Sequence, residues 1–94
     1  MLSRSRVGVD GVNRPDIWTA IKAERKRQSQ LWDRPHSHGE GDCSSAGVSL
    51  AVKVIVLGEE CGEVNRAYLE LDPDQMRTEL VQVAAVAVAI LEGL

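Results

Sequence analysis

The segment Leu80–Leu91, with the sequence LVQVAAVAVAIL, is apolar at every position except Gln82. A helix through this segment is apolar on nearly all sides, and such a helix must be covered on nearly all sides. The chain has only 94 residues, which is room for one small domain. Because two further helices of one chain cannot easily cover it, the segment predicts a homo-oligomer, a dimer or a tetramer, with an interface built on this helix.

A second helix is predicted from about Ala46 to Leu71. Its apolar residues alternate by four and three, which is typical of a seam that packs on another helix: Leu50, Val54, Leu57, Cys61, Val64, Tyr68 and Leu71. The portion VSLAVKVIVL is rich in valine and fits a strand on propensity alone. The helical spacing runs through it without a turn signal before Gly58, so we expect a helix here and no sheet in the protein.

The third helix opens at the sequence DPDQ. Asp72 is the expected cap, Pro73 takes the first helical position, and Gln75 completes a capping-box pattern. The helix is expected to end at about Glu92, with Gly93 as its stop. The short connection between the second and third helices makes them antiparallel neighbours.

Before these two helices, the sequence predicts a first helix from Pro15 to Asp33, because proline suits a first turn. Residues 1–13 show no periodicity and are expected to be a flexible lead. Residues 34–47, RPHSHGEGDCSSAG, are rich in glycine and serine and are expected to form a loop. The predicted fold is all-α: one domain over residues 14–94, with three antiparallel helices completed into a four-helix-type bundle by oligomerisation.

The stretch LGEECGEV, Leu57–Val64, places three carboxylates within five residues of the second helix. At 100° per residue, Glu60 and Glu63 share one flank of the seam, and Lys53 lies near that flank two turns earlier. Glu59 is expected to point to the opposite side, toward solvent. Glu60 and Glu63 can therefore aim at one point.

Glu79 and Gln82 repeat the same spacing on the third helix. Antiparallel packing brings Glu79 across from Glu60 and Glu63, and three half-buried carboxylates cannot all stay ionised without a partner. One cation would resolve this, and oxygen-only ligands favour Mg²⁺ or Mn²⁺. The competing interpretation is a solvated helix face, which is the usual role of a run of charges.

The stretch LGEECGEV followed by ELVQVAAVAVAIL resembles the MazG-like nucleotide pyrophosphohydrolases of the all-α NTP pyrophosphatase superfamily. Their signature is ExxE and then ExxD on two antiparallel helices. Glu60 and Glu63 match the first pair, Glu79 matches the first member of the second, and Gln82 stands where Asp is expected. ERKRQSQLW, Glu24–Trp32, also resembles the first helix of a phage and bacterial subset. The resemblance covers about residues 17–94.

The resemblance implies Mg²⁺-dependent hydrolysis of nucleoside or deoxynucleoside triphosphates to the monophosphate and pyrophosphate. It implies that Glu60, Glu63 and Glu79 are catalytic and hold the metal together with Gln82. A glutamine can ligate through its carbonyl oxygen but brings no charge, so the site would hold three charges instead of four. The alternative is a catalytically degenerate helical oligomerisation module of the same fold. A di-iron bundle lacks support, because no histidine lies on a predicted helix.

Four residues are candidates for substrate binding. Lys53 can hold a phosphate, Glu24 and Gln28 can contact the nucleotide, and Trp32 can stack on a base. Each also has a structural interpretation: a surface lysine, a hydrogen-bonded polar pair on an apolar stripe, and a core tryptophan.

The remaining features concern the compartment and other partners. His36, His38, Asp42 and Cys43 lie in the loop at a spacing that matches no familiar zinc site, so we favour a loop that closes over the substrate. A net charge of −3 disfavours a nucleic-acid partner. The longest apolar run is too short to span a bilayer. The opening residues lack a signal-peptide core and the cysteines lack disulfide spacing, so we expect a cytoplasmic protein.

Overall fold

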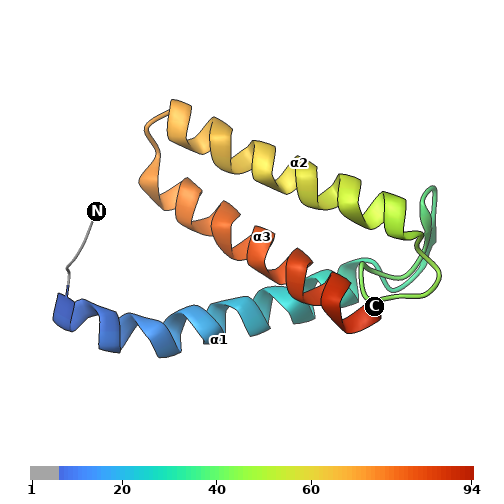
Figure 1. The fold of residues 1–94 in the computed structure, drawn as a ribbon, viewed down its shortest axis with the longest axis horizontal. Coiled ribbons are helices and arrows are strands. Elements are labelled where there is room, and N and C mark those ends of the chain that lie inside the picture. Colours follow the sequence, from blue (N-terminus) through green and yellow to red (C-terminus); the bar gives the residue numbers. More distant parts are fainter. Residues whose placement is uncertain (1–6) are drawn as a thin grey trace.

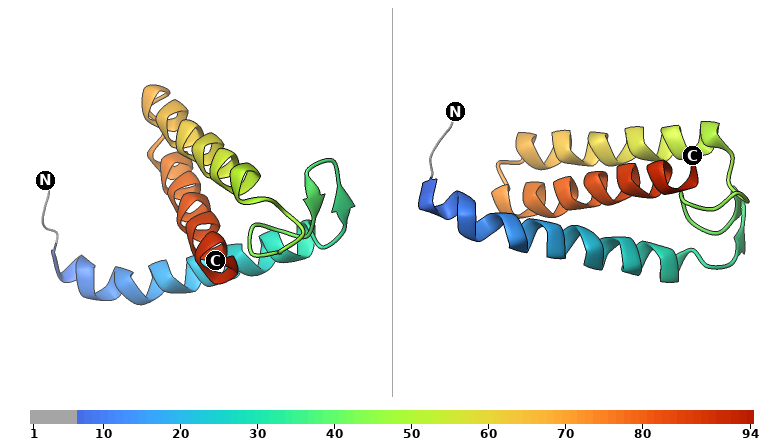
Figure 2. Two further views of the ribbon diagram at one scale, coloured as in Figure 1. Left: turned by 45° about the vertical axis from the view of Figure 1, so that its right-hand side comes forward. Right: turned by 60° about the horizontal axis from the view of Figure 1, so that its bottom comes forward.

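The computed structural model describes residues 7–94, with side chains described from Asp16 onward. It contains the helices α1 (Val7–Leu31), α2 (Leu50–Leu69) and α3 (Pro73–Gly93), and the short strands β1 (Pro35–His36) and β2 (Gly39–Glu40). α2 and α3 form an antiparallel pair, and α3 lies between α2 and α1 and packs against both (Figure 1 and Figure 2). The prediction of a three-helix, all-α chain is confirmed.

The first helix begins at Val7 and not at Pro15. The helix thus includes residues 7–13 of the predicted lead, whose residues 1–6 lie outside the described residues. Pro15 removes one backbone hydrogen bond, but extending an existing helix is far easier than nucleating one, so the helix continues through the proline. At its other end the helix stops at Leu31, two residues before the predicted end.

The loop between α1 and α2 contains a two-stranded antiparallel ladder, which corrects the expectation of no sheet. Pro35 pairs with Glu40 and His36 with Gly39. Gly39 also pairs with Val48, and it has a φ of +133°, which only glycine adopts readily. A side chain at position 39 would clash with the carbonyl oxygen of Gly47. The close approach of two loop segments thus depends on this glycine.

The caps of α2 and α3 follow from their sequences. Ser49 caps α2 by accepting a hydrogen bond from the backbone N–H of Val52 at 3.2 Å, so α2 starts at Leu50 and not at the predicted Ala46. The carboxylate of Asp72 accepts from the N–H of Gln75 at 3.0 Å, and Pro73 opens α3 as predicted.

The core of the single chain is small. Its buried apolar residues are Ile21, Val48, Ala67, Ala85, Val86 and Ala89, and among the described residues no large side chain is fully buried. The radius of gyration is 14.8 Å, against about 12 Å for a compact chain of this length. One chain therefore forms an open layer of helices and does not enclose a core.

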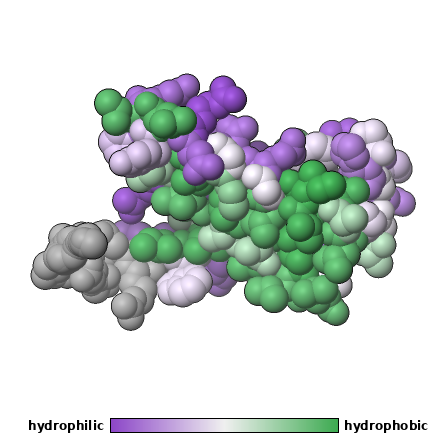
Figure 3. Space-filling model, turned by 45° about the horizontal axis from the view of Figure 1, so that its top comes forward, coloured by the Kyte–Doolittle hydropathy of each residue, from purple (hydrophilic) through white to green (hydrophobic). Residues whose placement is uncertain are grey.

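Many large apolar side chains remain exposed, and they form a broad hydrophobic area on the surface (Figure 3). On α2 the expected seam faces outward: Leu50 is 53% exposed, Val54 56% and Tyr68 68%. Lys53 and Ala67 are the buried residues of α2. The seam does not pack within the single chain, because α3 covers the neighbouring flank of α2, so its packing on another helix stays a prediction. Leu80 and Leu91 are also exposed, so α1 and α2 leave part of α3 uncovered.

Among the described residues, the helices are too short or too polar to cross a lipid bilayer.

Candidate functional site

A groove of about 400 Å³ lies between α1, α2 and the loop. α1 contributes Arg27, Gln28, Leu31 and Trp32; the loop contributes His36, His38, Gly41, Asp42, Cys43 and Val48; α2 contributes Val52, Val56, Glu59 and Glu60; and α3 contributes Val86. α1 and α2 both pack on α3 (Figure 2), and the groove is lined by residues of α1, α2 and the loop, with Val86 of α3. Valines make one part of its wall, and charged groups and an aromatic ring make the rest.

Glu60 is a half-buried carboxylate on the α2 wall of this groove. Burial raises its pKa above the ordinary value, and the negative charges of Glu79, Glu63 and Glu24 raise it further. The structure therefore brings acidic residues from all three helices within electrostatic reach of Glu60. The predicted site of Glu60, Glu63 and Glu79 stays a prediction, and Glu24 on α1 adds a further negative charge that raises the pKa of Glu60.

Glu79 is buried, with 8% of its surface exposed. Its carboxylate accepts a hydrogen bond from the side-chain amide of Gln75 at 2.7 Å. Gln75 was expected to complete a capping box, but its side chain reaches forward along α3 to Glu79. Glu63 is exposed on α2. The carboxylates thus approach one another from differently solvated positions.

No group of three or more acidic, histidine or cysteine side chains in residues 16–94 is arranged around one point as metal ligands. The oxygen donors nevertheless fit a hard divalent cation, because the charges that raise the pKa of Glu60, after burial, all belong to carboxylates. A cation would lower the repulsion among them. Glu60, Glu63 and Glu79 are the residues that would hold it.

Gln82 lies on the side of α3 that faces α1. It lines a second, shallow cavity together with Glu24, Arg27 and residues of both helices. It is half-buried and does not line the groove. Its position beside Glu24 places it next to the acidic group and not at its centre.

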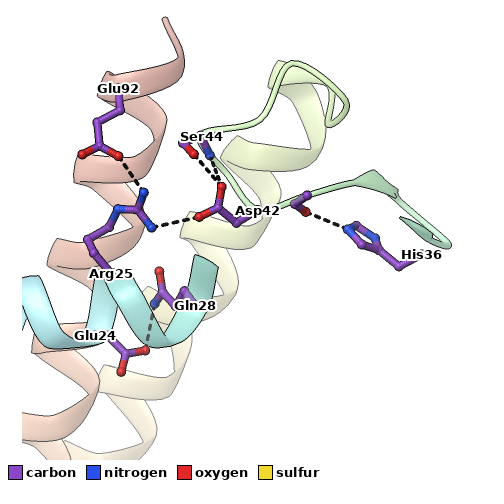
Figure 4. Close-up of polar contacts among 8 residues, drawn as sticks. Glu24, Arg25, Gln28, His36, Asp42, Ser44 and Glu92 are labelled. Carbon is purple, nitrogen blue, oxygen red and sulfur yellow. Dashed lines mark hydrogen bonds and ion pairs between the residues drawn. The ribbon is translucent and has the colours of Figure 1, made fainter. Parts of the chain in front are cut away.

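Glu24 is already paired within α1. Arg27 donates two hydrogen bonds to its carboxylate, at 2.8 and 2.7 Å, and Gln28 donates a third at 2.9 Å (Figure 4 shows Glu24 and Gln28). The hydrogen bond from Arg27 lowers the pKa of Glu24 more than burial raises it. The structural interpretation of Glu24 and Gln28 as a bonded pair is therefore realised, and Gln28 also borders the groove.

Arg27 was not among the predicted site residues. Its guanidinium lies at the edge of the groove, half exposed, and the negative charge of Glu60 contributes to raising its pKa. The signal was available in the spacing, because Arg27 follows Glu24 by three residues and both lie on the side of α1 near α3. Among the described residues it is the one arginine or lysine that lines the groove, and its guanidinium is paired with Glu24.

Lys53 lies elsewhere. It is 5% exposed on the flank of α2 that faces α3, and it does not line the groove. The ammonium group of Lys53 lies at the C-terminal end of α3, since a Cβ atom built onto Gly93 would be 3.1 Å from the Nζ atom of Lys53. A cation at a helix C-terminus is favourable. The structure thus gives Lys53 a structural position instead of the predicted one near the carboxylates.

Glu59 lines the groove with Glu60, although it is exposed. The prediction that it points to the opposite side was wrong, because the groove extends along α2 past the flank of Glu60. Trp32 borders the groove as well, and its ring packs edge-on against His36 at 5.2 Å. Trp32 is 39% exposed, so it is not a core residue and part of its ring is available to a ligand.

The polar residues of the loop build the loop itself. His36 Nε2 lies 2.8 Å from the carbonyl oxygen of Gly41. Asp42 accepts hydrogen bonds from the N–H and hydroxyl of Ser44 and from Arg25. These contacts, and not a shared metal, account for the positions of His36 and Asp42 (Figure 4).

Comparison with the profiles of known protein families, with curated proteins and with solved structures gave no match.

Proposed function

We propose that the protein is a metal-dependent nucleotide pyrophosphohydrolase. The observation that supports this most is the environment of Glu60: a half-buried carboxylate in a groove wall, with acidic residues from three helices raising its pKa. Such an arrangement is unfavourable without a cation, and perturbed carboxylates in a cleft are typical of functional sites. Mg²⁺ or Mn²⁺ bound by Glu60, Glu63 and Glu79 is the cofactor in this proposal.

The groove also offers what a nucleotide needs. The ring of Trp32 and the valines at positions 52 and 56 provide a surface for a base, and the amide of Gln28 can orient it. Arg27 replaces Lys53 as the proposed phosphate contact, because its guanidinium lies at the groove edge near Glu60. When bound, the metal would neutralise phosphate charge and lower the pKa of a water molecule for attack.

We propose further that the protein works as a homo-oligomer. At 100° per residue, four exposed residues of α2 lie roughly opposite the groove residues Val52 and Val56: Leu50, Val54, Cys61 and Tyr68. On α3, the exposed residues Leu80 and Leu91 likewise point away from the groove residue Val86. We call this surface, made of those six exposed residues, the back face. It bears no charge. A second copy packed on it would complete a four-helix-type bundle from two α2–α3 pairs.

A specific observation favours a second candidate, a helical oligomerisation module without catalysis. Residues 16–94 contain no preformed ligand group, and Gln82 brings no charge to the acidic group. The back face would then be the working part of the molecule.

Titration with Mn²⁺, followed by calorimetry, separates the two candidates. We expect the wild type to bind and Gln82→Asp to bind about tenfold more tightly, because a fourth carboxylate joins Glu79 one turn away on α3. The matched control is Gln30→Asp, which makes the same change at an exposed position of α1. If neither the wild type nor Gln82→Asp binds Mn²⁺, the module is the correct assignment.

A further inference from the structure

The loop between α1 and α2, residues 34–49, is an internally bonded unit. The N–H of Glu40 donates to the carbonyl oxygen of Gly47 at 3.0 Å, and the hydroxyl of Ser45 donates to the carbonyl oxygen of Glu40 at 2.7 Å. The ladder of β1 and β2 adds to these bonds. A unit that is bonded within itself can move as one body, so its attachment to the helices determines where it sits.

Arg25 of α1 makes the polar part of that attachment, beside the apolar burial of Val48. Its Nη1 donates to Asp42 in the loop at 2.9 Å, and its Nη2 donates to Glu92 in the last turn of α3 at 2.6 Å (Figure 4). The side chains of Arg25 and Asp42 are 15% and 7% exposed. Among residues 16–94, this is the one side-chain hydrogen bond between loop and helices, apart from local bonds at the two ends of the loop.

The surroundings of Asp42 favour the ionised carboxylate that this contact needs. Burial opposes its ionisation, but two hydrogen bonds from Ser44 and the guanidinium of Arg25 outweigh burial and hold the pKa of Asp42 below its ordinary value. The carboxylate is therefore charged at neutral pH, and one of its oxygens is left to accept from Arg25. Because the pair is shielded from water, it is stronger than an exposed ion pair.

The same loop is one wall of the groove. Asp42, Cys43, Gly41, Val48 and both histidines line it. If the loop moves away from α1, the groove loses that wall, while Trp32, Glu60 and the other helix residues stay in place.

We propose that Arg25 is a positioning residue for the groove: by holding Asp42, it keeps the loop in place as a wall, so that loop order and ligand binding in the groove are coupled. The coupling to a ligand rests on the proposed function, since the ligand there is a nucleoside triphosphate. The anchoring of the loop does not rest on it. By linkage, a ligand that contacts the loop must also stabilise the contact between Arg25 and Asp42.

The half-buried thiol of Cys43 reports on the loop. In a Cys61→Ser background it is the single thiol of the chain, and its rate of alkylation by a maleimide measures how often the loop opens. We expect Arg25→Met and Asp42→Asn each to raise this rate about tenfold or more, the factor for one lost hydrogen bond to a charged group. Glu92→Gln is the control, because it removes a contact of Arg25 that does not reach the loop.

The two test variants have opposite direct effects on the thiol. After burial, the charge of Asp42 raises the pKa of Cys43, whereas that of Arg25 lowers it. Asp42→Asn would therefore speed alkylation and Arg25→Met would slow it if the loop stayed closed. An increase in both variants, with unchanged far-UV circular dichroism, supports the anchor. No increase in Arg25→Met, or an equal increase in Glu92→Gln, overturns it.

Protection by a ligand tests the coupling. In the wild type, we expect Mg²⁺ and a non-hydrolysable nucleoside triphosphate to slow the alkylation of Cys43. We expect Arg25→Met and Asp42→Asn to bind the nucleotide about tenfold or more weakly than Glu92→Gln does. If nucleotide binds equally well to all variants, the coupling is refuted. If the variants open the loop but no nucleotide protects Cys43, the anchor stands and the proposed function fails.

Discussion

Replacing Glu60 with glutamine should abolish pyrophosphate release and raise the thermal stability of the metal-free protein. The loss of activity follows from removing a ligand of the proposed metal. This should raise the activation free energy by several kcal/mol and lower the rate about a hundredfold or more. The gain in stability follows from the pKa of Glu60, which burial and then Glu79, Glu63 and Glu24 raise. Ionised Glu60 therefore destabilises the fold at neutral pH.

The pH dependence of this gain has a definite sign. A carboxyl group whose pKa is higher in the folded than in the unfolded protein costs stability above the folded pKa. That cost disappears as pH falls to the unfolded value of 4.5. The melting temperature of Glu60→Gln should exceed that of the wild type at pH 7, and the difference should vanish near pH 4. About 1 kcal/mol shifts the midpoint by about 4–8 °C in a domain of this size.

The control for this prediction is Glu40→Gln, since Glu40 is exposed in β2 and does not line the groove. Thermal melts over the pH range, with and without Mg²⁺, provide the measurement. Mg²⁺ should stabilise the wild type and not Glu60→Gln. If Glu60→Gln and Glu40→Gln have the same melting temperature and activity, the carboxylates do not form a site.

The second large effect is expected from Val54→Glu on the back face. A charge placed in an apolar interface has no partner there, which costs several kcal/mol and should dissociate the oligomer. Sedimentation at low micromolar concentration should show the wild type as a multiple of the 10.3 kDa chain and the variant as a monomer of lower stability. The matched control is Ala46→Glu, which adds the same charge to the exposed loop.

A wild type that sediments as a monomer would contradict the proposed oligomer, and so would an unchanged mass of Val54→Glu. Val86→Glu is a poorer test, because Val86 is 3% exposed in the core of the single chain. A charge there would unfold the protein whether or not it associates.

Local signals made the two C-terminal helices predictable. Asp72 and Pro73 fix the start of α3, and the regular spacing through VSLAVKVIVL identifies α2 despite its valines. The hairpin was missed because each of its strands has only two residues, too few to show the alternating pattern of a strand. The start of α1 was missed because a proline inside a helix resembles a proline at its first turn.

The antiparallel packing of α2 on α3, which follows from their short connection, was predictable from the sequence. The site of Glu60, Glu63 and Glu79 stays a prediction, because the described residues contain no group arranged as metal ligands. Lys53 was misplaced because a helical wheel does not reveal which flank the next helix covers, and α3 covers the flank that carries Lys53.

Arg25 shows what spacing cannot provide. Its partners Asp42 and Glu92 lie 17 and 67 residues away along the chain, so only the folded structure joins them.

The most direct test of the proposed activity is to incubate the protein with each nucleoside and deoxynucleoside triphosphate in Mg²⁺ and to quantify all products. The account predicts nucleoside monophosphate and pyrophosphate in equal amounts from at least one substrate, a requirement for Mg²⁺ or Mn²⁺, and no release by Glu60→Gln. Release of orthophosphate and a nucleoside diphosphate, or no product from any nucleotide, would contradict it.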